Sequence, residues 1–293
     1  MNQIILSKHQ IILIEESKRN YEKLIPQINE LQKKYTIAEL NEMCEKANLY
    51  YEQLIKSNYS QNLEQVIHQI SYEFDKFREQ LNINFEVNTT QEIPTIIKQS
   101  LKEMINYGWY PDFNGFSING LIRFSKEVDE LSKDEINDFF VDYYKNKIEA
   151  IKEKIFNIFP IRKDVLQAAF DAHEKENYLL AIPIFLIHID GISLDTFKKY
   201  FFIKKKGTNY PEILDTIEKM NFLSEFSLSL LTPFQSEQPI TYSEKQRGED
   251  FKQFNRHQIM HGESLDYGTE INSYKAISLL LYIVQASDII DRA

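Results

Sequence analysis

Apolar residues recur at intervals of three and four along most of the chain, the spacing that places them on one face of an α-helix. The pattern is clearest in residues 62–81, where the apolar positions are Leu63, Val66, Ile67, Ile70, Phe74, Phe77 and Leu81. This stripe predicts a helix that packs on a core. A coiled-coil surface is the less favoured alternative, because the repeat lasts only about three heptads.

Turn and capping signals predict two helices in the next part of the chain. Pro94 suits the first turn of a helix and Gly108 suits its end, so IIKQSLKEMINYG predicts the first helix. The second begins at LSKDEIN, where Ser132 and Glu135 have the spacing of a capping box, and ends before Pro160.

The segment WYPDFNGFSINGLIRF lies between these two helices and concentrates aromatic residues, asparagine and glycine. This composition predicts an ordered loop. Trp109 and Tyr110 are expected to fix the loop to a hydrophobic core, because large aromatic rings gain most from burial.

Two further helices are predicted within RKDVLQAAFDAHEKENYLLAIPIFLIHIDGI, the first extending through Phe170 and the second ending at Gly191. The second helix is apolar along most of its length, which predicts a central, buried position. His188 is accordingly expected to be a core histidine, whereas His173 is expected at the surface. A last apolar helix, YKAISLLLYIVQASDII, follows near the C-terminus.

Composition agrees with an all-α fold. The 293 residues include only eight glycines and eight prolines, too few for many tight hairpins. The single cysteine, Cys44, excludes an intramolecular disulfide and a CxxC metal site, which fits a reducing compartment. No stretch approaches the roughly 18 apolar residues of a membrane-spanning helix, and the N-terminus lacks an export signal. We therefore expect a cytoplasmic protein without a membrane partner.

The net charge of −10 limits nucleic-acid binding to a local basic site, because the molecule as a whole repels phosphate. The densest basic run in the second half of the chain is KKYFFIKKKG. Such a run is usually a solvated face, and a phosphate-contacting patch is the alternative.

Residues 255–262 read NRHQIMHG and contain the strongest candidate chemistry, since the common nucleotide-binding and nucleophile motifs are absent. His257 and His261 are four residues apart, so a helix would place both rings on one face. A zinc site there would need a third ligand, such as Glu263 or Asp266, and nothing in the spacing requires one. A metal site is therefore not favoured.

Arg256 and His261 suit a different chemistry, the cleavage of RNA by attack of its own 2′-hydroxyl. A guanidinium stabilises the charge that develops on the phosphate, and an imidazole transfers protons near neutral pH. In the alternative interpretation Arg256 is an ion-pair partner, and His261 is a helix-terminal residue beside its Gly262 cap. The spacing alone favours this alternative.

The longer segment NRHQIMHGESLDYGTEINSYKAISLLLYI resembles the C-terminal signature of HEPN-domain proteins, in which an arginine, a polar residue and three to five further positions precede a histidine. Arg256, His257 and His261 occupy these positions. The segment FPIRKDVLQAAFDAHEKENYLLAIPIFLIHIDGI is similar to the preceding helix pair of that family. The resemblance covers roughly residues 155–293, and more loosely the GWYPDF region.

The resemblance implies a HEPN-like helical bundle at 155–293. A connecting helical region is expected at 96–154 and an N-terminal helical region at 1–95; the size of the N-terminal region and its lack of catalytic motifs indicate a regulatory role. HEPN domains commonly dimerise so that two motifs share one cleft, and many are metal-independent endoribonucleases without a cofactor. The expected substrate is RNA, either tRNA or mRNA. The implied role is that of a toxin or phage-defence effector, with an antitoxin or regulatory protein as a further partner.

The resemblance also assigns roles to individual residues. Arg256 would stabilise the phosphate in the transition state, and His261 would act as acid or base. His257 occupies the polar position of the motif and is included among the catalytic residues. Asn255, Glu263 and Tyr267 are the candidate substrate-binding residues. Some HEPN proteins do not cleave RNA, so the alternative function is a non-catalytic helical dimerisation or binding module.

Overall fold

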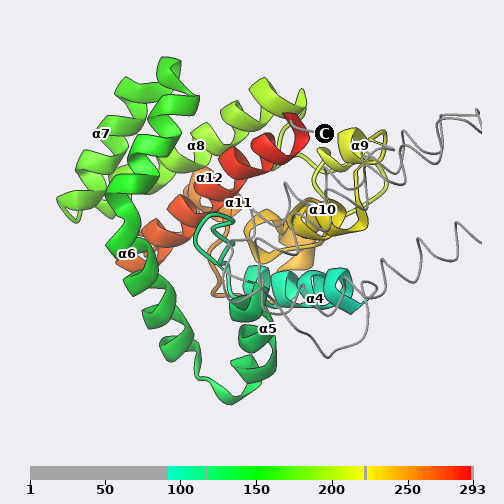
Figure 1. Ribbon diagram of the computed structural model, residues 1–293. Helices are drawn as coiled ribbons and strands as arrows, with labels where there is room; N and C mark the ends of the chain where they lie inside the picture. Colours follow the sequence, from blue (N-terminus) through cyan, green and yellow to red (C-terminus); the bar gives the residue numbers. More distant parts are fainter. Residues whose placement is uncertain (1–91, 117, 221–222, 292–293) are drawn as a thin grey trace, which may run out of the picture.

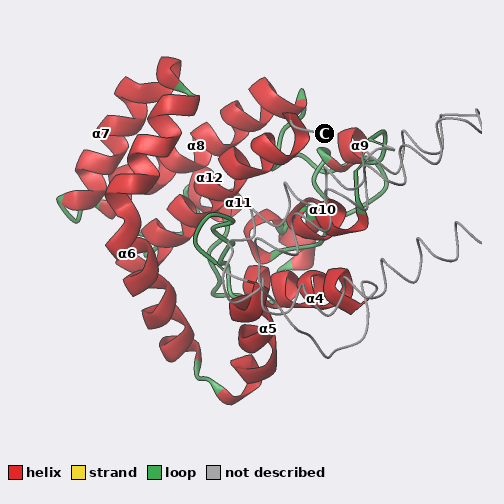
Figure 2. Cartoon of the chain, in the orientation of Figure 1, coloured by secondary structure: helices red, strands yellow, loops and turns green. Residues whose placement is uncertain are grey.

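The computed structural model describes residues 92–291, apart from residues 117 and 221–222, and this part of the chain is all-α, as predicted (Figures 1 and 2). The only strand-like pairing among the described residues is an isolated bridge between Lys204 and Pro211. The predicted helix at 62–81, His9, His68 and Cys44 lie outside the described residues. The described α-helices are α4 (Glu92–Asn106), α5 (Ile118–Glu127), α6 (Lys133–Ile158), α7 (Lys163–Glu174), α8 (Tyr178–Phe197), α9 (Leu214–Ile217), α10 (Glu225–Leu230), α11 (Arg256–Met260) and α12 (Glu270–Asp291).

The capping signals in the sequence fix the helix ends where they were predicted. Gly108 adopts a φ of +82°, which a glycine reaches without strain, and α4 ends two residues before it. Ser132 caps α6 and forms the predicted capping box with Glu135. Pro160 follows the end of α6 within a short 3-10 turn.

The aromatic segment after α4 is partly a loop and partly a helix. Trp109 and Tyr110 are fully buried, as predicted. The prediction of a loop throughout was wrong, because α5 begins at Ile118 and contains Gly120. Leu121 and Val128 lie on the buried side of this segment, and burial of such a stripe outweighs the turn preference of an Asn-Gly pair.

Helix α8 packs against α7 and α12, and its apolar sequence covers two different environments (Figure 1). The predicted central position is confirmed and one face is buried, but Leu180 and Ile187 on the opposite face are 59 % and 52 % exposed, so the burial is one-sided. The helix also continues past Gly191 to Phe197. The Arg162 guanidinium lies where a side chain at Gly191 would project, so the glycine serves packing and does not end the helix.

His173 on α7 is buried, which corrects the prediction of a surface histidine. Its Nδ1 is 2.8 Å from the Ser273 hydroxyl on α12. Burial lowers the pKa of His173 to about 4, so the ring is neutral near pH 7. His188 is only half-buried and lies 3.1 Å from a guanidinium nitrogen of Arg162.

One hydrophobic core joins the described helices. It contains Ile97 and Trp109 from the predicted connecting region and Phe170, Phe185 and Tyr282 from the predicted C-terminal domain. Within the described residues, the connecting region and the C-terminal region therefore fold together. Helix α12 runs through this core beside α8, and almost every residue from Ser273 to Ser287 is buried.

Candidate functional site

The arginine-histidine motif forms α11, a short helix whose start is fixed by Asn255. The Asn255 side-chain oxygen accepts a hydrogen bond from the Gln258 N–H, as an N-cap does. Its amide group donates to the carbonyls of Pro239 and Tyr242. Asn255 is only 1 % exposed. A side chain this deeply buried is not positioned to contact a substrate, as was expected of Asn255. Asn255 instead holds the motif in the fold.

Arg256 begins α11 and reaches across to α8. A guanidinium nitrogen lies 3.9 Å from a carboxylate oxygen of Asp190, and the group stacks over the Phe202 ring at 5.4 Å. The Arg256 side chain stays 32 % exposed, whereas that of Asp190 is 16 % exposed. The contacts orient the guanidinium while leaving part of it accessible to a phosphate.

Asp190 links three segments of the chain at this point. Besides the Arg256 contact, its other carboxylate oxygen accepts a hydrogen bond of 3.0 Å from the Phe202 N–H. Burial raises the pKa of Asp190, and the Phe202 N–H and Arg256 oppose this effect. Asp190 therefore positions both the motif arginine and the aromatic ring beneath it.

The two histidines lie on the same face, as their spacing predicts. The ring centroids of His257 and His261 are 4.3 Å apart. His261 is the C-cap residue and is exposed, and Gly262 follows with a φ of +71°. Burial lowers the pKa of His257, and the neighbouring His261 lowers it further. A neutral imidazole at position 257 is able to accept a proton.

Glu263 contacts the motif but is held by a second arginine. One of its carboxylate oxygens is 3.7 Å from His257 Nε2, and the other accepts a hydrogen bond of 2.9 Å from Arg247. The Arg247 side chain is only 6 % exposed, and its Nε has no hydrogen-bond partner among the described residues. Sequence reasoning missed Arg247, Asp190 and Phe202 as neighbours of the motif, because they come from separate segments.

Tyr267 is not brought to the Arg256 end of the site. Its hydroxyl donates to the Leu179 carbonyl at the start of α8. Asp190 lies eleven residues further along that helix, about 16 Å by its rise per residue. Tyr267 therefore anchors the loop between α11 and α12, and its predicted contact with substrate stays a prediction.

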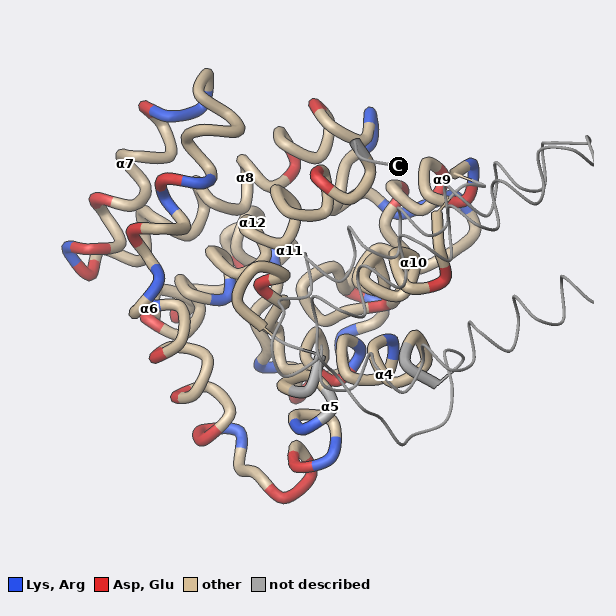
Figure 3. The backbone as a smooth tube through the Cα atoms, in the orientation of Figure 1, with Lys and Arg blue, Asp and Glu red and all other residues tan. Residues whose placement is uncertain are grey.

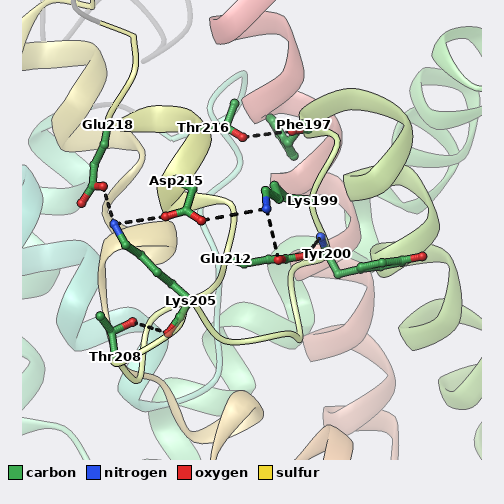
Figure 4. Close-up of polar contacts among 9 residues, drawn as sticks. All are labelled: Phe197, Lys199, Tyr200, Lys205, Thr208, Glu212, Asp215, Thr216 and Glu218. Carbon is green, nitrogen blue, oxygen red and sulfur yellow. Dashed lines mark hydrogen bonds and ion pairs between the residues drawn. The ribbon is translucent and has the colours of Figure 1, made fainter.

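Two lysines of the basic run at 198–206 are paired with neighbouring carboxylates (Figure 4). Lys199 lies 3.4 Å from Glu212, and Lys205 lies 3.2 Å from Asp215 and also pairs with Glu218. These pairs favour the interpretation as a solvated face. Elsewhere in the described chain, Lys and Arg are interspersed with Asp and Glu (Figure 3).

No three His, Cys, Asp or Glu side chains among the described residues are close enough to hold a metal ion. Glu263 approaches His257, but Arg247 occupies its other oxygen. The arrangement is therefore closer to two histidines beside the Glu263–Arg247 ion pair than to a zinc site.

The expectation that no stretch is long and apolar enough to cross a membrane was wrong for α8, which passes this test by length and composition alone. Its packing against α7 and α12 is also typical of a core helix in a soluble protein.

Comparison with known proteins gives no relative from which function can be inferred. No family model matches the chain, and no curated protein or solved structure is similar to it at a significant level. The residues around α11 are therefore the basis from which function is inferred.

Proposed function

We propose that the chain is a metal-independent endoribonuclease of HEPN type, with Arg256 and His261 as catalytic residues. The observation that supports this most is the Arg256 guanidinium, partly exposed and oriented by Asp190 and Phe202, on the same short helix as two adjacent imidazoles. Charge stabilisation and proton transfer are the two requirements of this reaction.

In the proposed reaction, a histidine removes the proton from the RNA 2′-hydroxyl, whose oxygen attacks the adjacent phosphorus. The P–O5′ bond breaks, and the leaving 5′-oxygen receives a proton from a second, protonated histidine. The products are a 2′,3′-cyclic phosphate and a 5′-hydroxyl. Arg256 stabilises the additional negative charge on the phosphate oxygens. DNA lacks the attacking hydroxyl and does not react.

The proton-transfer groups are His261 and its neighbour. His261 is exposed at the end of α11, where it is free to meet a substrate. The lowered pKa of His257 favours its neutral form, so this ring suits the accepting role or the orientation of the substrate. In a homodimer, the second copy would supply a complementary pair of groups.

The setting we propose is a cytoplasmic toxin or phage-defence effector that acts on tRNA or mRNA and is restrained by an antitoxin or a regulatory protein. Residues 1–95 are the proposed regulatory part.

A non-catalytic helical binding module is a second candidate. The ion pair of Arg256 with Asp190 and its contact with Phe202 favour this alternative, because they give the arginine a structural role. The module would bind a partner and leave RNA intact.

Substitutions of the motif residues distinguish the two candidate functions. Arg256→Ala and His261→Ala should each reduce RNA cleavage by about a hundredfold or more while the circular-dichroism melting curve stays intact. Arg123→Ala removes an exposed arginine of α5 and is the matched control with unchanged activity. Cleavage that persists in both motif variants would contradict the proposed function.

A further inference from the structure

Arg247 is a buried cation in the loop that precedes α11. Its side chain is only 6 % exposed, and a guanidinium nitrogen donates a hydrogen bond of 2.9 Å to a carboxylate oxygen of Glu263. The guanidinium Nε has no hydrogen-bond partner among the described residues. Burial of a charged group lowers stability unless its hydrogen-bonding atoms are paired. A cation kept in such a place therefore indicates a role beyond stability.

Both ends of this ion pair are held by the backbone. Arg247 follows the 3-10 turn η5 (Glu244–Gln246), and its N–H donates to the Ser243 carbonyl. On the other side, the Glu263 N–H donates a hydrogen bond of 2.8 Å to the Gln258 carbonyl of α11. Because each residue is tied to an ordered turn, the ion pair confines the Glu263 carboxylate to a narrow range of positions beside α11.

The other carboxylate oxygen of Glu263 faces His257. It lies 3.7 Å from Nε2 of the ring, within ion-pair range of a protonated histidine. A ring nitrogen that faces a carboxylate is the one that carries hydrogen, and the other nitrogen then keeps its lone pair. In this arrangement Nδ1 of His257 is the nitrogen that can accept a proton. The imidazolium formed in this way is stabilised by Glu263.

The groups around His257 keep its ring neutral before a proton is transferred. Burial lowers the pKa of His257 most, and the adjacent His261 ring lowers it further. Arg247 and Arg256 act in the same direction, whereas Glu263 raises the pKa. The ring is therefore mostly neutral near pH 7, and Glu263 favours its charged form. A general base needs both properties.

We propose that Arg247 and Glu263 are positioning residues that act through His257 and make it the general base of the cleavage reaction. The inference rests on the proposed function. Nδ1 of His257 takes the proton of the RNA 2′-hydroxyl as the oxygen attacks phosphorus, while Nε2–H faces the Glu263 carboxylate. The P–O5′ bond breaks, and the leaving oxygen takes its proton from a protonated histidine, for which His261 is the remaining group of the motif. Arg247 fixes the carboxylate and does not touch the reacting atoms.

Titration of the His257 ring tests the contact without any substrate. Followed by NMR in the full chain, the pKa of His257 should fall by roughly half a pH unit in Glu263→Gln, because the carboxylate that favours the charged ring is lost. The signal of this ring is the one missing from His257→Gln. Glu249→Gln, at an exposed glutamate of the loop before α11, is the matched control with an unchanged pKa. An unchanged pKa in Glu263→Gln would overturn the inference.

The role of Arg247 is tested by repeating this titration in two further backgrounds. In Arg247→Leu, Glu263→Gln should move the pKa of His257 by much less, because the carboxylate is no longer fixed beside the ring. Arg247→Lys should preserve most of the shift, since an ammonium still pairs with the carboxylate. Circular dichroism checks that each variant folds, and Glu263→Gln in the unmodified background needs no change at the buried arginine. An equal shift in all backgrounds would show that Arg247 does not position Glu263.

The pH profile of cleavage separates this inference from the proposed function. The value of kcat/KM should rise with pH as His257 loses its proton, so in Glu263→Gln this rise should move to lower pH. The maximal kcat should fall by about tenfold or more, because the protonated base is less stabilised. An active Glu263→Gln with the wild-type profile would overturn the role of His257 as base and leave the nuclease proposal standing. A wild-type chain that leaves RNA intact would overturn both.

Discussion

Arg256 is the residue on which most contacts of the site converge. It is held by a carboxylate from α8, by an aromatic ring from the following loop and by the N-cap of its own helix. A side chain held in this way loses little conformational entropy when a phosphate binds. The same contacts would also stabilise a purely structural arginine, so the role of Asp190 provides a test.

Asp190→Asn should lower kcat for RNA cleavage by roughly ten- to a hundredfold, because a misplaced guanidinium stabilises the transition state less well. Asparagine still accepts the Phe202 N–H, so the melting temperature should change little. Asp138→Asn, an exposed substitution on α6, is the control. If Asp190→Asn left kcat unchanged, Asp190 would not position the arginine.

The buried histidine His173 should make the stability of the fold depend on pH. Its pKa in the folded chain is about 4, below the value of about 6.5 expected after unfolding, so the unfolded chain binds more protons between these values. The free energy of unfolding should therefore fall as the pH drops from about 6.5 to 4. His173→Gln should reduce this loss of stability at acid pH, as measured by urea denaturation at a series of pH values. If stability fell equally steeply with decreasing pH in the variant, other titratable groups would be responsible for the pH dependence.

At the scale of elements, the loop after α4 is attached to α12 by buried polar contacts as well as by aromatic packing. Gln285 accepts a hydrogen bond of 2.8 Å from the Phe113 N–H and donates one of 2.7 Å to Asp112. Tyr143 from α6 donates to the same aspartate. The loop therefore acts as a connection between α6 and the central helix.

Gln285→Leu should destabilise the fold by about 2–3 kcal/mol, because it leaves the buried Phe113 N–H without its acceptor and removes one of the hydrogen bonds to Asp112. Urea denaturation measures this change. Gln253→Ala, at an exposed glutamine, should stay within about 0.5 kcal/mol of wild type. A neutral Gln285→Leu would show that water replaces these hydrogen bonds.

Local sequence signals predicted the elements whose ends depend on local chemistry. The Ser132 capping box, the Gly108 terminus and the histidine pair all follow from interactions within a few residues. The predictions failed where distant packing decides the outcome. Gly191 looked like a helix end, but Arg162 from another segment makes it an interior packing position.

At the scale of the whole molecule, the sequence predicted the all-α class and the motif residues, but not their surroundings. Asp190, Phe202 and Arg247 reach α11 from three separate segments, and only the fold brings them together. The exposure of one face of α8 could not be predicted either, because exposed and buried apolar residues look alike in sequence.

The chemistry of RNA cleavage tests the central proposal most directly. The purified chain, incubated with RNA in excess EDTA, should produce fragments ending in a 2′,3′-cyclic phosphate and beginning with a 5′-hydroxyl, and DNA of the same sequence should remain intact. End-specific labelling and mass spectrometry identify both termini. Loss of cleavage in EDTA, or fragments with 5′-phosphate and 3′-hydroxyl ends, would contradict the metal-independent mechanism assigned to Arg256 and His261.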